Sequence, residues 1–232
     1  MYDYDLISGK VNKVSYQRGW SDQLYHRYSY DADNRLTELE GSNDSIYWEK
    51  DAAYEYYRHG PLSRLVRGQN QVKGLDYAYT IQGWLKGVNS TAMQPTFDMG
   101  GDGSNTSSVA RDAFGFSLNY YNSPNGGDYT SIGTTSSNPF ATVSDNLGLL
   151  TDNIHTGNNL YNGNIRAMLV NVPQLGNANL YAYRYDQLNR IKAMNSFTGF
   201  NNSTNLFTNS NVPTATENYK ERVTYEPNGN IR

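Results

Sequence analysis

Four oxygen-bearing side chains gather around a glycine-rich stretch and have the chemistry of cation ligands. They are Asp98, Asp102, Asn105 and Asp112. Hard cations such as Ca²⁺ take oxygen ligands from carboxylates and amide carbonyls, and a loop can supply several of them. The spacing matches no EF-hand loop and offers no bidentate glutamate. Two interpretations therefore stay open, a Ca²⁺ site and an ordinary turn-rich loop, and we favour the loop.

The other residue types that do chemistry lack the spacing of a catalytic or cofactor site. The three histidines, His26, His59 and His155, are scattered and form no metal-binding pair. The run of residues 100–103 is glycine-rich but lacks the Lys-Ser/Thr of a phosphate loop, and no serine lies in a nucleophile elbow. We expect no catalytic residue, no enzyme activity and, calcium aside, no cofactor.

Two Asp–Arg pairs, Asp31 with Arg35 and Asp186 with Arg190, have the same spacing of four residues. An acid beside a base can act in catalysis. Each pair, however, recurs in a predicted turn, where an aspartate accepts backbone N–H groups and a guanidinium makes charge-assisted hydrogen bonds. The pattern therefore favours a structural role for both pairs.

These pairs belong to a repeated motif of strand, four-residue turn and strand. In the first clear copy, Tyr28 and Tyr30 lie two apart and share one face of a strand, Asp31 opens the turn, and Arg35-Leu36 opens the return strand. Asn34 is placed where the turn requires positive φ. A near copy and three weaker ones have these signature residues: Tyr183, Tyr185, Asp186, Asn189, Arg190 and Ile191; Tyr56 and Gly60; Tyr79 and Gly83; Tyr225 and Gly229.

The spacing of the motif indicates stacked repeats. The tyrosines Tyr4, Tyr30, Tyr56 and Tyr79 follow one another at intervals of 26, 26 and 23 residues, a period typical of units that bury their faces against neighbours. We expect repeat hairpins in residues 1–90 and 159–232, separated by a Gly/Ser/Asn-rich insertion at 91–158 within the same domain. Within the insertion, residues 114–120 alternate like a strand, and residues 143–150 are a candidate for one helical turn. Both ends resemble a truncated repeat domain.

Composition favours an all-β protein with thin, partly polar sheets. Hydrophobic residues make up only 37%, and tyrosine (21 residues) outnumbers phenylalanine and tryptophan together; tyrosine combines strand propensity with a hydroxyl suited to a wet surface. The net charge of −3 gives no electrostatic footprint for nucleic acid, and no apolar run is long enough for membrane insertion. The absence of cysteine excludes disulfides and thiolate sites.

The repeated turn resembles the YD repeat of the RHS family, in its bacterial polymorphic-toxin and Bacteroidetes-like forms. Tyr30-Asp31, Asn34-Arg35-Leu36, Tyr185-Asp186 and Asn189-Arg190-Ile191 carry the resemblance. It implies an extended, curved antiparallel sheet of consecutive hairpins, a segment of a hollow shell around a C-terminal toxin or other cargo, in a secreted or cell-surface protein. The implied partners are the rest of the polypeptide and that cargo. The family's self-cleavage motif is absent: Glu226-Pro227-Asn228-Gly229 is the nearest text and lacks its aspartate.

Two further possibilities stay open. Exposed tyrosines can stack on sugar rings or contact a protein, so an adhesin-like module that binds glycans or a protein partner is the alternative function. An isolated segment with two open sheet edges is also expected to associate edge to edge.

Overall fold

The structure, a computed structural model, describes residues 1–121, 127–130, 139–145, 159–207 and 215–232. The chain divides into two compact units. The first unit contains residues 1–76 and 102–111, and the second contains residues 77–101 and 112–232.

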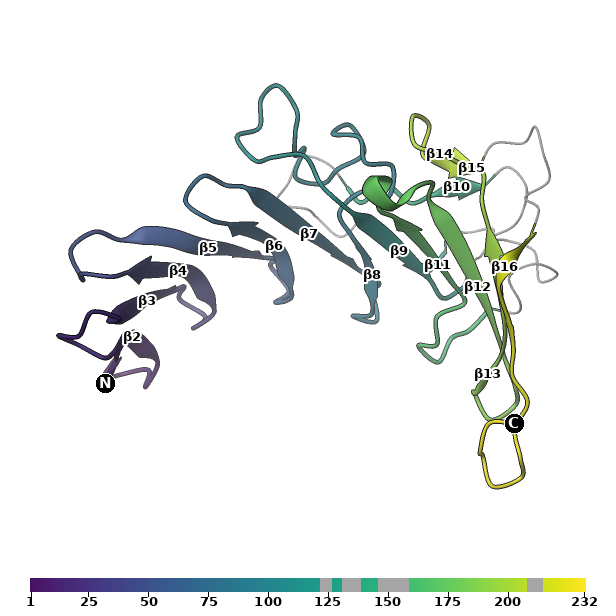
Figure 1. Ribbon diagram of the computed structural model, residues 1–232, viewed down its shortest axis with the longest axis horizontal. Helices are drawn as coiled ribbons and strands as arrows, with labels where there is room; N and C mark the ends of the chain where they lie inside the picture. Colours follow the sequence, from purple (N-terminus) through teal and green to yellow (C-terminus); the bar gives the residue numbers. More distant parts are fainter. Residues whose placement is uncertain (122–126, 131–138, 146–158, 208–214) are drawn as a thin grey trace. The chain divides into compact units, whose positions relative to one another are not determined.

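Strands make up almost all of the regular structure, as the composition predicted (Figure 1). The first unit contains β1 (Tyr2–Tyr4), β2 (Val11–Tyr16), β3 (Leu24–Tyr30), β4 (Leu36–Ser42), β5 (Glu49–Tyr56) and β6 (Leu62–Arg67). Strand β7 (Lys73–Tyr79) runs across the division between the units. The second unit adds β8 (Leu85–Val88), β9 (Gly115–Asn119), β10 (Ser144–Asp145), β11 (Ala167–Asn171), the 3₁₀ turn η1 (Pro173–Leu175), β12 (Asn179–Tyr185), β13 (Ile191–Phe197), β14 (Phe200–Asn201), β15 (Leu206–Phe207) and β16 (Ala215–Arg222).

Thirteen of these strands pair antiparallel in the order β1-β2-β3-β4-β5-β6-β7-β8-β9-β11-β12-β13-β16. The order in this sheet follows the order along the chain, so each strand pairs with the next strand of the same sheet. The three short strands left over, β10, β15 and β14, form a separate small sheet. The prediction of an all-β protein built from consecutive antiparallel hairpins is confirmed. None of the described helical residues forms a segment with the length and hydropathy needed to cross a membrane.

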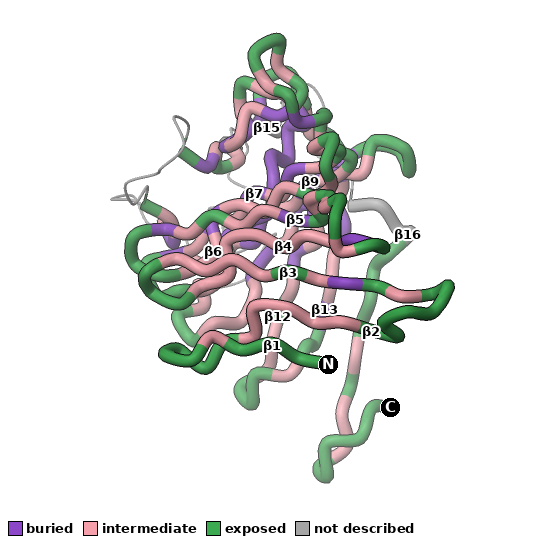
Figure 2. Tube along the Cα trace, turned by 90° about the vertical axis from the view of Figure 1, so that its left-hand side faces the viewer, coloured by how far each residue is buried: buried purple, intermediate pink, exposed green. Residues whose placement is uncertain are grey.

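In the first unit the two faces of the sheet carry different side chains. Successive residues of a strand point to opposite faces, and the register places Tyr54 opposite Leu65 on one face. The other face carries charges, with Arg27 Nε 2.6 Å from Glu40 Oε2 on the neighbouring strand. Most residues of β3 and β4 are only partly buried, and these strands are mostly pink in Figure 2.

The second unit has a denser core, because segments between the strands pack on one face of its sheet. Along β12, Leu180 and Ala182 are fully buried, whereas Tyr181 and Tyr183 on the opposite face are partly buried. The buried face forms a cluster with Val143 and Phe200 from the connecting segments packed against it; its members are Ala167, Leu169, Ala178, Leu180, Ala182 and Phe197. The buried stretches around β9 and β15 are purple in Figure 2.

Small residues let the connecting segments approach this face closely. A Cβ atom on Gly87 would lie 2.5 Å from the ring of Phe140, and one on Gly115 would lie 2.2 Å from the carbonyl oxygen of Ser90. Glycine inside a strand often marks such an approach. The layer over the sheet therefore depends on the absence of side chains at these two positions.

Buried asparagines join the segments to one another. The amide of Asn171 donates to the carbonyl of Thr91 at 2.7 Å and to Asn202 Oδ1 at 3.0 Å. The amide of Asn205 donates to two carbonyls of residues 141–142 at 3.2 and 3.1 Å. Three of these four bonds end on backbone carbonyls outside the strands, and the bond from Asn171 to Thr91 connects segments 80 residues apart.

The structure tests two local predictions within the insertion. The predicted strand at 114–120 is confirmed as β9, which pairs with β11, Asn119 lying opposite Ala167. Strands β9 and β11 are therefore antiparallel neighbours in the sheet. The helical turn predicted at 143–150 is wrong at Ser144–Asp145, which form β10 by pairing with β15, and residues 146–150 lie outside the described residues.

Candidate interaction surface at the repeated turns

The repeated turns share one backbone geometry. In the first clear copy, Asp31 N donates to Arg35 O and Asn34 N donates to Asp31 O, both at 3.0 Å. The same two bonds close the turns at 57–61, 80–84, 186–190 and 226–230. The five residues predicted to adopt positive φ all do so: Asn34 (61°), Gly60 (117°), Gly83 (83°), Asn189 (62°) and Gly229 (91°).

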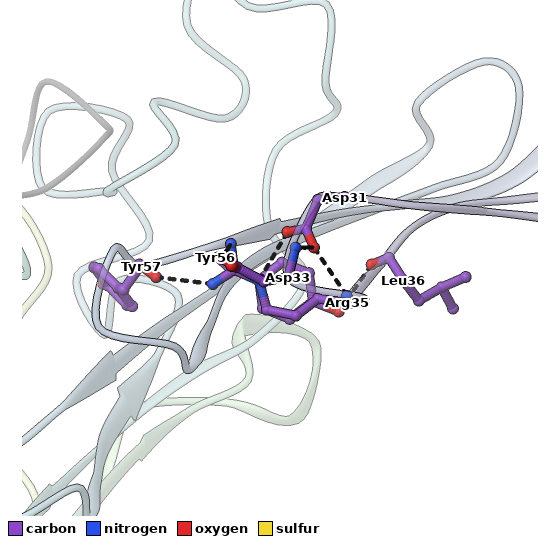
Figure 3. Close-up of polar contacts among 6 residues, drawn as sticks. All are labelled: Asp31, Asp33, Arg35, Leu36, Tyr56 and Tyr57. Carbon is purple, nitrogen blue, oxygen red and sulfur yellow. Dashed lines mark hydrogen bonds and ion pairs between the residues drawn. The ribbon is translucent and has the colours of Figure 1, made fainter. Parts of the chain in front are cut away.

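The aspartate of the turn is used entirely within its own repeat (Figure 3). One oxygen of Asp31 accepts the backbone N–H groups of Asp33 and Arg35, each at 2.9 Å, and the other accepts Arg35 Nε at 2.8 Å. The backbone N–H of Arg35, and after it the guanidinium, hold the pKa of the Asp31 carboxyl below its usual value. Asp186 has the same arrangement with Arg190 and a lowered pKa for the same reasons.

The arginine of the turn reaches the next hairpin. The Arg35 guanidinium lies 4.7 Å from the ring centre of Tyr56, and Nη1 donates to the carbonyl of Tyr57 at 3.4 Å. Figure 3 shows Arg35 between Asp31 and these two tyrosines. In the second unit the Arg190 guanidinium lies 4.2 Å from the ring centre of Tyr225. The Asp–Arg pair therefore links two neighbouring repeats rather than facing a cleft.

Tyrosine hydroxyls make the second link between hairpins. Tyr56 Oη donates to the carbonyl of Leu36 at 2.8 Å, the first residue of the preceding return strand. Four further tyrosines donate to a carbonyl at the start of an earlier strand or, for Ile165, two residues before it: Tyr30 to Val11, Tyr120 to Leu85, Tyr185 to Ile165 and Tyr225 to Ile191, at 2.7–2.9 Å. Burial, and then the nearby Asp31 carboxylate, raise the pKa of Tyr56, so the phenol remains a donor. We call these five bonds the tyrosine ladder.

A β-bulge follows four of these turns, and a fifth lies in the hairpin of β1 and β2. Tyr30 lies opposite Leu36 while Ser29 lies opposite Glu38, so Thr37 is an extra residue. The same shift leaves one extra residue in four other hairpins, namely Asn12, Ser63, Lys86 and Lys192. A bulge bends its strand and increases the local twist, so these five hairpins carry the same local distortion. The five extra residues are all polar, but they include threonine, asparagine, serine and lysine, so no single residue type marks the bulge.

The other signature residues lie on the strands that flank the repeated turns. Tyr28 and Tyr183 are partly buried on strands β3 and β12, and Tyr79 lies opposite Leu85 across its hairpin. Leu36 and Ile191 lie opposite Tyr30 and Tyr185 and also supply ladder carbonyls. Four of the five ladder donors belong to the predicted signature, whereas Tyr120 does not. The acceptors were not predictable, because a backbone carbonyl belongs to any residue type.

The candidate calcium ligands fall in both units. Asp98 and Asp112 belong to the second unit, whereas Asp102 and Asn105 belong to the first. Within the first unit, Asp102 forms an ion pair with Arg64, which also pairs with Asp76. A guanidinium beside Asp102 competes with a metal ion for that carboxylate. The calcium site stays a prediction.

A buried ion pair that sequence reasoning missed lies in the second unit. Lys86 Nζ lies 2.7 Å from Asp128 Oδ1 and donates to Asn119 Oδ1 at 2.8 Å, while Asp128 Oδ2 accepts the backbone N–H of Tyr120 at 2.7 Å. Burial lowers the pKa of Lys86. Burial, and then the charge of Asp128, raise the pKa of Tyr120 to about 12. The carboxylate of Asp128 therefore contacts both Lys86 on β8 and the backbone directly after β9, and these contacts hold the segment around Asp128 on the sheet.

No protein-family model and no curated protein matches this chain. Among solved structures, a chain of the Tc holotoxin pore of Photorhabdus luminescens is similar, with a TM-score of 0.33 and 17% identity over 98% of this chain. The present chain spans only 12% of the length of that one. A likeness this distant carries no argument about function.

Proposed function

We propose that this chain is a non-catalytic structural segment of a repeat sheet, part of a wall that encloses a C-terminal toxin or other cargo in a secreted or cell-surface RHS-type protein. The observation that carries the structural role is the tyrosine ladder, because the same hydrogen bond from a tyrosine hydroxyl to a backbone carbonyl recurs between strands in both units. The enclosing role rests on the YD-repeat motifs. The rest of the polypeptide and the cargo are then the partners.

The polar groups of the signature support a structural role over a chemical one. A catalytic acid or base needs access to a substrate atom. Asp31 and Asp186 instead accept backbone N–H groups of their own turns, and their arginines lie over the tyrosine of the next hairpin. In both Asp–Arg pairs the carboxylate is therefore occupied within its own turn, and the guanidinium contacts the next hairpin.

Removal of ladder hydroxyls tests the structural role. The quadruple variant Tyr30→Phe, Tyr56→Phe, Tyr185→Phe and Tyr225→Phe keeps each ring but loses four hydrogen bonds. Each bond contributes roughly 0.5–1.5 kcal/mol, and distant sites add, so the free energy of unfolding should fall by about 2–6 kcal/mol. The matched control changes four exposed tyrosines to phenylalanine, namely Tyr2, Tyr4, Tyr47 and Tyr219. This control should leave the urea midpoint unchanged. Equal midpoints for both variants would contradict the proposal.

One observation favours the alternative, an adhesin-like module. In the second unit, Tyr121 and Tyr161 lie with ring centres 4.7 Å apart, and Tyr161 is 67% exposed. Gln82 Nε2 donates to Tyr121 Oη at 2.8 Å. Exposed aromatic rings beside amides suit a sugar, because a ring face offers apolar area next to polar groups. In that case Tyr161→Ala should abolish retention on a glycan array and leave the melting temperature unchanged, whereas no retention by the wild-type chain removes this alternative.

A further inference from the structure

The first unit contains a hollow of about 410 Å³ at one end of strands β3, β4 and β5. The side chains that matter for its chemistry are His26, Asp44, Tyr47, Glu49 and Asp51. None of the residues that line it belongs to the repeat signature. It is therefore a feature separate from the tyrosine ladder.

The strand register creates the hollow. Gly41 on the middle strand lies opposite His26 on one side and opposite Glu49 on the other. Because glycine has no side chain, no group projects from the backbone between these two residues. A shift in register leaves Asp51 as an extra residue on β5, and its carboxylate lies over the glycine, where a Cβ atom would be 2.8 Å from Asp51 Oδ2.

Neighbouring hydrogen bonds hold the rim in place. Asp44 Oδ1 accepts the backbone N–H groups of Ile46 and Tyr47 at 2.8 and 2.9 Å and the hydroxyl of Ser42 at 3.0 Å. These bonds fix the loop that carries Tyr47, whose side chain is 80% exposed. The hollow thus has an aromatic ring at a rigid edge.

The negative charge of the hollow has no lysine or arginine partner within its lining. Three carboxylates line it, and no lysine or arginine does. The nearest lysine in sequence, Lys50, directs its ammonium to Glu38 Oε1 at 2.5 Å on the opposite face. His26 Nε2 lies 4.0 Å from Asp51 Oδ2. A concave surface lined by several negative charges concentrates cations.

The same unit shows how this chain holds a cation. Arg35 lies between the Asp31 carboxylate and the ring of Tyr56. Arg27 lies between the Glu40 carboxylate and the ring of Trp48, 4.5 Å from its centre. Carboxylates with an aromatic ring are a strong combination for an organic cation. The hollow offers that combination, with Glu49, Asp51 and Tyr47, around open space.

We propose that this hollow binds an ammonium or guanidinium group at the end of a flexible chain. The group comes either from a lysine or arginine side chain of a partner polypeptide or from a free polyamine, and both present the same charged head and apolar stem. The proposal is independent of the wall function, because the site shares no residue with the ladder.

The test titrates the full 232-residue chain and follows the backbone amide of Gly41 by ¹H–¹⁵N NMR. The probes are a capped Gly/Ser pentapeptide with one central lysine, the same peptide with acetyl-lysine, and spermidine. The lysine peptide or spermidine should shift the Gly41 resonance in a saturable way, and acetyl-lysine should not. Binding by the peptide identifies a side-chain ligand, and binding by spermidine alone identifies a free polyamine. The shift should be lost at 1 M salt, where charges are strongly screened.

Three variants locate the site. Glu49→Gln with Asp51→Asn removes two charges, and Gly41→Ala, followed at the amide of the new alanine, adds a methyl group to the floor of the hollow; each should weaken binding at least tenfold. Glu55→Gln removes the same charge from the same strand outside the hollow and should change affinity less than twofold. A lack of saturable shifts, an equal loss in Glu55→Gln, or tighter binding of Ca²⁺ than of spermidine at Gly41 would overturn the proposal.

Discussion

The close approach of Phe140 to Gly87 predicts that a single added methyl group destabilises the second unit. A Cβ atom at Gly87 would lie 2.5 and 2.7 Å from two ring atoms of Phe140 and 2.8 Å from the carbonyl oxygen of Phe116. Contacts under 3.0 Å require something to move, and Phe140, 4% exposed, is packed with Ala78 and Met99. Overpacking of this kind costs typically about 1–3 kcal/mol, so Gly87→Ala should lower the free energy of unfolding by that amount.

Urea unfolding followed by circular dichroism measures the change, and Gly41→Ala is the matched control. Both glycines lie inside strands without positive φ, but a Cβ atom at Gly41 meets only the end of the partly exposed Asp51 side chain. Gly41→Ala should therefore be neutral, or stabilising by up to about 1 kcal/mol through the unfolded chain. Adding Phe140→Leu to Gly87→Ala should recover part of the loss. If Gly87→Ala is as stable as Gly41→Ala, the result contradicts the close packing of Phe140 on the sheet at Gly87.

Three further predictions concern the turns and the buried ion pair. Asn34→Ala should lower the free energy of unfolding by roughly 1 kcal/mol in urea because Asn34 has a φ of 61°, whereas Asn34→Gly should stay within about 0.5 kcal/mol of wild type; equal losses would contradict the turn. The pKa values of Asp31 and Asp186 are lowered in the folded chain, so their stabilisation is complete above about pH 4 and is lost as the pH falls through the folded pKa. Melting temperatures between pH 5 and pH 2 should therefore decline less steeply for Asp31→Asn with Asp186→Asn than for wild type, and parallel curves would refute this. Lys86→Met leaves the buried Asp128 without its cation and should cost about 3–5 kcal/mol in urea unfolding, with partial recovery on adding Asp128→Asn; a loss under about 1 kcal/mol would show that the pair is not buried.

The repeated hairpins were predictable because their signals are local. A turn that needs positive φ restricts one position to glycine or asparagine, as at Asn34 and Gly60. Alternation of tyrosine along a strand places Tyr28 and Tyr30 on one face without any knowledge of the partner strand. Both signals act over fewer than about ten residues, the length of one turn and its flanks.

The contacts between hairpins and the layer over the second unit were not predictable in the same way. The ladder ends on backbone carbonyls such as that of Leu36, which no residue type reveals. The bond from Asn171 to Thr91 spans 80 residues, and asparagine in a polar stretch reads as a turn residue. Glycines inside strands, at Gly87 and Gly115, were the one usable signal, since they mark a close approach.

The candidate site illustrates the same limit. The sequence offered Asp102 as a candidate calcium ligand, but Arg64, 38 residues away in sequence, pairs with it. By contrast, the structural interpretation of Asp31 and Arg35 depended on a spacing of four residues, and the two side chains do contact each other. Local partners can be predicted from spacing, whereas partners brought together by strand register cannot.

Protection of a cargo polypeptide tests the proposed wall most directly. The parent protein that contains this chain would be treated with a protease under native conditions, and survival of the segment C-terminal to its repeats would be followed over time. Enclosure predicts that this segment survives far longer in the parent than when expressed alone, and that the quadruple tyrosine-to-phenylalanine variant of the ladder shortens its survival. Equal survival of the segment inside and outside the parent would contradict the wall function.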